Sequence, residues 1–88
     1  MKFKDKYKIG GHWFDLKLTP CDNIDGGVGD FDRNNGIIRV SSDLQKSHRE
    51  QAFLHEVMHI VNNEMEEKEI EYLSQAIYAF LSDNDMLK

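Results

Sequence analysis

The sequence predicts a small α+β domain in which an antiparallel sheet of three or four strands packs on two C-terminal helices. Three observations predict this class. Polar and apolar side chains alternate through the first 40 residues, the repeat then lengthens to about 3.6 residues, and a polar break at residues 62–64 divides the helical part in two. With 88 residues in total, residues 1–88 are expected to form a single domain with a modest core.

The first half of the chain contains four segments with the pattern of strands. They are expected at residues 2–9, 12–18, 28–31 and 36–40. The first two segments are separated by Gly10 and Gly11, whose permissive backbone suits a hairpin turn. The last segment, GIIRV, is rich in β-branched side chains, which favour a strand.

The second half of the chain contains two segments with the pattern of helices. Ser47 stands three residues before Glu50, which is the spacing of a capping box, so the first helix is expected to begin beside His48. An apolar stripe with helical spacing follows, formed by Leu54, Val57, Met58 and Val61. The second helix is expected over residues 64–82.

Charge and composition argue against several classes of protein. The net charge is −5, whereas proteins that bind nucleic acids need positive surface to neutralise phosphates. No apolar run approaches the roughly 20 residues of a membrane span, and the charged N-terminus lacks the apolar core of a signal peptide. The single cysteine, Cys21, fits a reducing compartment. We therefore expect a cytoplasmic protein that binds neither nucleic acid nor membranes.

The segment FLHEVMHIV, residues 53–61, carries the pattern HExxH within the first predicted helix. His55 and His59 project from one face of a helix with Cβ atoms about 5–6 Å apart, so both imidazoles can bind one tetrahedral zinc ion. Glu56 lies about 100° around the helix from His55, where its carboxylate can take a proton from a zinc-activated water. The structural alternative is an amphipathic helix with two partly buried histidines. We interpret the segment as a zinc site.

A catalytic zinc site needs a third protein ligand, and no histidine follows His59. An acid near the start of the second helix is therefore expected, and the candidates are Glu64, Glu66, Glu67, Glu69 and Glu71. The apolar stripe expected to face inward on this helix is formed by Ile70, Leu73, Ile77, Phe80 and Leu81. With Ile70 at zero and about 100° per residue, this stripe centres near about 320°. Glu69 lies at the margin of that stripe, whereas Glu67 and Glu71 lie farther from it. Glu66 lies nearer the centre of the stripe but is a candidate for capping the helix at Asn63. Glu69 is the predicted ligand, and the other acids stay open as alternatives.

The stretch LHEVMHIV, followed by an acid-rich segment and EIEYLSQAIYAFL, resembles the ImmA/IrrE-type zinc metallopeptidases. It is most similar to their short versions in phages and other mobile elements. The resemblance covers residues 36–83. It implies a minimal zincin-like fold, zinc ligation by His55, His59 and Glu69, and a general-base role for Glu56. It also implies cleavage of a protein partner in the cytosol, such as a repressor.

Two functions of different classes follow from these residues. The first is a zinc metallopeptidase, which uses Zn²⁺ to hydrolyse a peptide bond in a protein or peptide substrate. The second is a non-catalytic binding or regulatory module, of a kind that phages encode, in which zinc only stabilises the fold. For the first function, the resemblance implies that residues 36–40 form a strand beside the metal with one unpaired edge, to which an extended substrate can pair.

Overall fold

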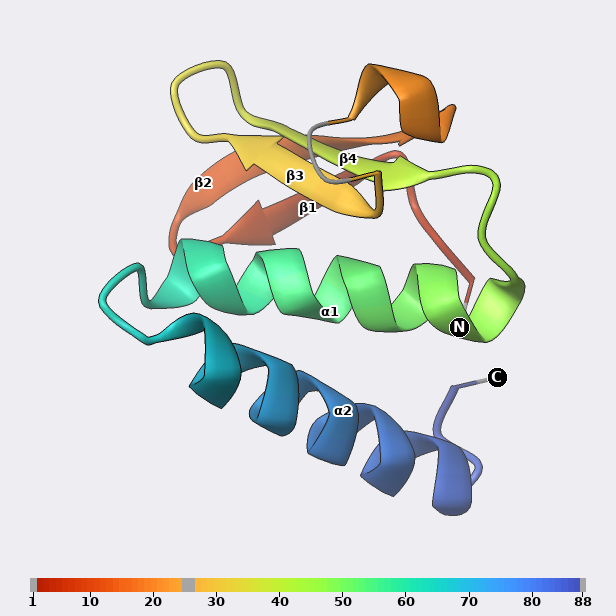
Figure 1. Cartoon of the computed structure of the whole chain (residues 1–88). Helices are drawn as coiled ribbons and strands as arrows, with labels where there is room; N and C mark the ends of the chain where they lie inside the picture. The colour runs from red at the N-terminus through yellow and green to blue at the C-terminus, as the bar shows by residue number, and fades with distance from the viewer. Residues whose placement is uncertain (1, 25–26, 88) are drawn as a thin grey trace.

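The computed structural model, which describes residues 2–24 and 27–87, has its strands in the first half of the chain and its helices in the second (Figure 1). The elements are, in order, β1 (Lys6–Ile9), β2 (His12–Thr19), the 3-10 helix η1 (Cys21–Asn23), β3 (Gly29–Asp32), β4 (Ile37–Ser41), α1 (Lys46–Val61) and α2 (Glu67–Asp83). The predicted α+β class with two C-terminal helices is confirmed. No helix within the described residues is long and apolar enough to cross a membrane.

The four strands form one mixed sheet with the order β1-β2-β4-β3. The β1–β2 and β3–β4 pairs are antiparallel, but β2 and β4 run parallel. A parallel pair needs a crossover of roughly a dozen or more residues, and residues 20–36 supply it. The prediction of an antiparallel sheet is therefore wrong for this pair, because the most buried strand, β4, lies in the middle of the sheet beside β2.

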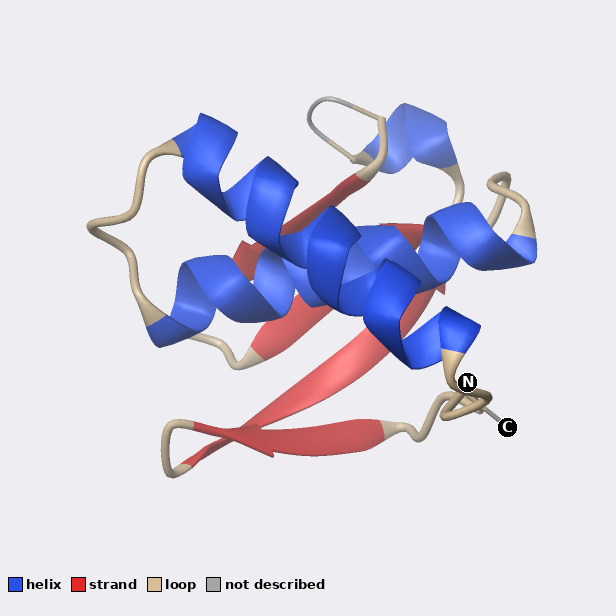
Figure 2. Ribbon diagram, turned by 90° about the horizontal axis from the view of Figure 1, so that it is seen from below, coloured by secondary structure: helices blue, strands red, loops and turns tan. Residues whose placement is uncertain are grey.

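The sheet, α1 and α2 are stacked as three successive layers (Figures 1 and 2). The hydrophobic core lies between the sheet and α1, and its buried members are Ile9, Phe14, Ile38, Val40, Ala52, Phe53 and Ile60. Helix α2 lies on the side of α1 that faces away from the sheet. Ile70 and Ser74 are the buried residues of α2, so the third layer is held by much less buried surface than the second.

Two tight connections depend on glycine. Gly10 and Gly11 join β1 to β2 with φ angles of 59° and 85°, so the predicted hairpin turn is confirmed. Gly36 precedes β4 with a φ of 64°, and a Cβ atom there would lie 2.7 Å from the carbonyl oxygen of Trp13. Glycine at this position therefore allows β4 to enter the sheet close against β2.

Both helices begin at different residues from those expected. The N-cap of α1 is Gln45, and Ser47 lies inside the first turn, so the capping-box prediction is wrong. Helix α2 begins at Glu67 because the residues before it form a turn, in which the Asn62 side chain accepts a hydrogen bond from the backbone N–H of Glu64 at 3.1 Å. The shift places Glu67 in the first helical turn, where the helix dipole favours a carboxylate.

Candidate metal centre

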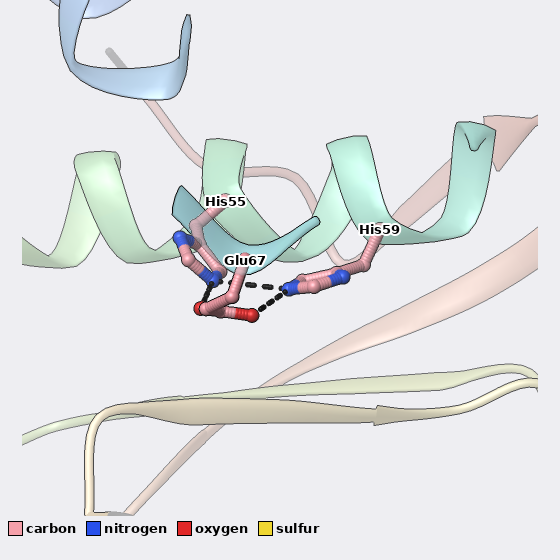
Figure 3. Close-up of side chains that lie close together, drawn as sticks. All are labelled: His55, His59 and Glu67. Carbon is pink, nitrogen blue, oxygen red and sulfur yellow. Dashed lines mark hydrogen bonds and ion pairs between the residues drawn. The ribbon is translucent and has the colours of Figure 1, made fainter. Parts of the chain in front are cut away.

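Two histidines and one glutamate bring their ligand atoms together between α1 and α2 (Figure 3). His55 and His59 lie one turn apart on α1, and their Nε2 atoms are 3.1 Å apart. Glu67 directs its carboxylate at both rings, with Oε1 2.7 Å from Nε2 of His55 and Oε2 2.8 Å from Nε2 of His59. The histidine pair therefore faces a carboxylate from the second helix, which is the ligand set of many catalytic zinc sites.

The nature and spacing of these ligand atoms fit a zinc ion. Imidazole nitrogens and carboxylate oxygens bind zinc at about 2.0–2.2 Å, so a tetrahedral ion separates its ligand atoms by about 3.3–3.4 Å. The observed separations of 2.7, 2.8 and 3.1 Å need only a small opening of the side chains. The Glu67 side chain is 61% exposed, so the cluster is open to solvent on one side and has room for water or a substrate.

Glu69, the predicted third ligand, does not belong to this cluster, and Glu67 occupies the expected place. Within the part of the chain that the structure describes, the cluster consists of His55, His59 and Glu67. The prediction for Glu69 fails geometrically because α2 is rotated relative to the expected orientation. With Ile70 at zero, the two buried residues of α2 lie at about 0° and 40° and Glu67 at about 60°, whereas Glu69 lies at about 260°.

The rotation of α2 is visible in the exposure of its apolar residues. The expected stripe included Ile77 and Phe80, but these side chains are 42% and 59% exposed. The inward face instead carries Ser74, which is 3% exposed and whose hydroxyl donates a hydrogen bond to the carbonyl oxygen of Glu71 at 3.1 Å. A serine whose hydroxyl is hydrogen-bonded to a carbonyl of its own helix can be buried at low free-energy cost. The hydrophobic pattern of the sequence does not predict such a buried serine.

Glu56 lies beside the three clustered residues and is buried, with 8% of its surface exposed. It sits beneath β3, because a Cβ atom on Gly29 would lie 3.5 Å from its Cγ atom. Burial raises the pKa of Glu56 to about 7, with smaller contributions from the negative charges of Asp30 and Glu67. The structure thus places the predicted general base next to the histidines, under a strand that limits its contact with water.

A cavity of about 680 Å³ contains the whole constellation. Its walls come from β3, α1 and the first turns of α2, and apolar side chains such as Val28, Phe31 and Leu44 form part of them. Four carboxylates line the cavity, belonging to Asp30, Glu56, Glu67 and Glu71, and its described lining contains no lysine or arginine. The size of the cavity suits a short peptide segment.

The strand at the edge of the sheet beside this cavity is β3. The expectation that residues 36–40 form an open edge is wrong, because β4 pairs with β2 on one side and β3 on the other. The backbone N–H of Ser41 donates a hydrogen bond to the carbonyl oxygen of Val28 at 2.9 Å. In an antiparallel pair, successive residues point their N–H and C=O groups alternately toward and away from the partner strand. Gly29 and Phe31 therefore direct their main-chain groups away from β4. The Phe31 ring stacks on His59, with ring centroids 6.3 Å apart.

A second polar contact holds α2 on α1 at the end far from the cluster. The Tyr78 hydroxyl donates a hydrogen bond to Oε1 of Glu50 at 3.0 Å, and Glu50 is only 3% exposed. Sequence analysis missed this pair, although a tyrosine on α2 and an acid within the apolar face of α1 were available as a signal. Tyr78 is therefore engaged away from the cluster, and it lines a separate cavity.

The chain was also compared with known protein families, with curated proteins and with solved structures, and none of them matches it. The interpretation of the site therefore depends on its geometry and on the chemistry of its side chains. The element order, the HExxH helix and the carboxylate from the following helix are the observations that any function must explain.

Proposed function

We propose that the protein is a zinc metallopeptidase. The observation that carries this proposal is the convergence of His55, His59 and Glu67 on one point, with Glu56 buried beside it. A structural zinc site is closed by four protein ligands, whereas three ligands at a solvent-open position are typical of a catalytic site. The further acid next to the ligands is the group that peptide hydrolysis needs for proton transfer.

Three residues would bind the metal and a fourth would transfer the proton. His55, His59 and Glu67 would hold the zinc ion, which supplies a nucleophilic water at neutral pH and a Lewis acid for the substrate carbonyl. The Glu56 carboxylate would accept a proton as the water oxygen attacks the carbonyl carbon. It would then give that proton to the amine nitrogen as the C–N bond breaks, so the carboxylate is regenerated. Its position under Gly29 places this carboxylate between β3 and α1.

The edge of β3 is the proposed position of the substrate backbone. Gly29 and Phe31 have main-chain groups directed away from β4, and both residues line the cavity next to the cluster. An extended peptide that pairs with this edge would bring a carbonyl group toward the ligand atoms. A cytoplasmic protein partner, such as a repressor with an extended and accessible segment, is the substrate that we propose.

The weak packing of α2 favours a second candidate function, a non-catalytic module in which zinc only stabilises the fold. Apart from Ile70 and Ser74, the residues of α2 are at least partly exposed, so a metal bound to Glu67 would add a substantial restraint to this layer. Glu56 distinguishes the two candidates, because a purely structural site has no need of a buried carboxylate beside its ligands.

The experiment that tests the proposal combines metal analysis with proteolysis. We expect about one zinc per chain in the purified protein, and loss of tight binding in His59→Ala. Glu56→Gln should retain zinc but fail to cleave peptides and candidate cytosolic proteins that the wild type cleaves. Equal cleavage by both proteins would contradict the assigned role of Glu56. Full zinc occupancy without cleavage by the wild type would favour the non-catalytic module.

A further inference from the structure

One side of α2, adjoining the face that packs on α1, carries exposed apolar side chains. Figure 2 shows α2 as the outermost layer of the molecule. We name this side the outer strip, and it is formed by Tyr72, Leu73, Ala76, Ile77 and Phe80. The side chain of Tyr72 is 72% exposed, that of Ile77 is 42% exposed and that of Phe80 is 59% exposed. Large apolar side chains gathered in this way on one helix face are typical of a protein interaction site.

Acidic side chains stand at both ends of the outer strip. Along the helix, Glu69 lies four residues before Leu73, and Asp83 lies three residues after Phe80, so both fall on the same face as the strip. Residues 62–85 contain seven acidic side chains and one basic side chain, Lys68, in a chain whose net charge is −5. The negative charge of the protein is therefore concentrated on α2 and on the connection that precedes it.

This charge decides which kind of molecule can cover the strip. Nucleic acids and anionic membranes are negatively charged, so both would be repelled. In a symmetric pair of α2 helices, the acidic ends of one strip would meet the acidic surroundings of the other, which is unfavourable. A helix with an apolar stripe between lysines or arginines satisfies both features, because its stripe covers the apolar side chains and its cations face the carboxylates.

We propose that the outer strip of α2 binds a basic amphipathic helix of a protein partner. The apolar stripe of the partner packs on Leu73, Ile77 and Phe80, and its basic side chains lie near Glu69 and Asp83. This interaction goes beyond the proposed peptidase function and does not depend on zinc. In a peptidase, however, the same surface would recruit a basic substrate, because Glu67 belongs to the same helix and the cavity is also acidic.

NMR titration of the ¹⁵N-labelled full chain tests the proposal directly. The probe is a synthetic amphipathic peptide of about 18 residues with one leucine stripe and lysines elsewhere, long enough for five helical turns. Its matched control has glutamate in place of every lysine. We expect the lysine peptide to shift the amide signals of the outer strip and its helical neighbours, with weaker binding at high salt. The glutamate peptide should leave these signals unchanged.

Matched variants distinguish specific binding at the outer strip from nonspecific binding to any exposed apolar side chain. The double variant Ile77→Ser and Phe80→Ser should weaken binding of the lysine peptide by about tenfold or more, because the central apolar contacts of an interface dominate its affinity. The corresponding control, Trp13→Ser with Leu18→Ser, removes two exposed apolar side chains of β2 and should bind as the wild type does. All of these positions are exposed, so the variants should remain folded.

Four results would overturn the proposal. The first is binding of the glutamate peptide as tight as that of the lysine peptide, and the second is an equal loss of lysine-peptide affinity in the α2 and β2 double variants. The third is no shift of outer-strip signals at about 1 mM lysine peptide, a concentration that detects even weak complexes. The fourth is a dependence of outer-strip signals on protein concentration without peptide, abolished by the α2 double variant. That result would assign the surface to a second copy of this chain.

Discussion

The burial of Glu56 predicts that the metal-free protein is destabilised as the pH rises, and that Glu56→Gln removes this effect. In the folded protein, burial raises the pKa of Glu56 from 4.5 to about 7. Between these two values the folded state keeps a proton that the unfolded chain releases. Stability therefore falls as the pH rises through this window, and the loss is complete above about pH 7. Below the unfolded pKa the effect is absent.

The size of the effect follows from the same two pKa values. Their difference corresponds to about 3 kcal/mol at about 1.4 kcal/mol per pH unit. Glu56 borders a cavity that is open to solvent, and water there screens part of the penalty. We therefore expect about 1–2 kcal/mol of stability for Glu56→Gln over the wild type above pH about 7, and almost none below pH about 4.5.

Urea denaturation in the presence of a chelator measures this difference as a function of pH. Subtracting the wild type from the variant cancels the titration of the shared groups that do not interact with Glu56. Glu71→Gln is the matched control, because Glu71 lines the same cavity but is exposed, and its curve should stay within about 0.5 kcal/mol of the wild type. A Glu56→Gln difference that is constant over the whole pH range would refute the argument.

Three further predictions concern the metal centre, the anchor of α2 and the entry to β4. Glu67→Ala should lower zinc affinity by more than the about 10–100-fold that follows loss of a group merely hydrogen-bonded to a metal ligand, and Glu69→Ala should leave it nearly unchanged. Competition with a chromophoric chelator measures both affinities, and the reverse order would restore the sequence-based assignment. Tyr78→Phe should lower the free energy of unfolding by about 1 kcal/mol, because Glu50 loses a hydrogen-bond donor, and urea denaturation checks this. Gly36→Ala should cost at least about 1–2 kcal/mol by the same measurement, since its φ is positive and its Cβ would meet a carbonyl oxygen; an unchanged midpoint would show that this turn adjusts freely.

Features that depend on neighbouring residues could be predicted from the sequence. The relation between His55 and His59 is set by one turn of helix, so it was available as soon as the segment was interpreted as helical. The hairpin at Gly10 and Gly11 is local in the same sense, because two permissive residues between alternating segments define it. The α+β class follows from the order of such local patterns and needs no knowledge of how they pack.

Features that depend on pairing between distant segments could not be predicted in this way. The parallel contact of β2 with β4 joins residues that are more than 20 positions apart, such as Asp15 and Ile37. Alternation of side chains shows which residues share a face of a strand, but it does not show which strands are neighbours. The resemblance implies a substrate edge at residues 36–40, whereas the pairing leaves β3 at the edge.

The orientation of α2 has two consequences that arise from a single rotation. Helical spacing predicts that the stripe with Ile77 and Phe80 faces inward, and in that orientation Glu69 lies at the margin of the stripe, within reach of α1. Ile70 is buried as expected, but the structure turns Ser74 inward beside it, which brings Glu67 to the histidines and leaves Ile77 and Phe80 partly exposed to solvent. Because Ile70 and Ser74 are the only buried residues of α2, polar contacts also help to hold the helix in place. The contact of Glu67 with the histidines does so at one end of α2, the hydrogen bond of Tyr78 does so at the other, and the outer strip is left free to bind a partner.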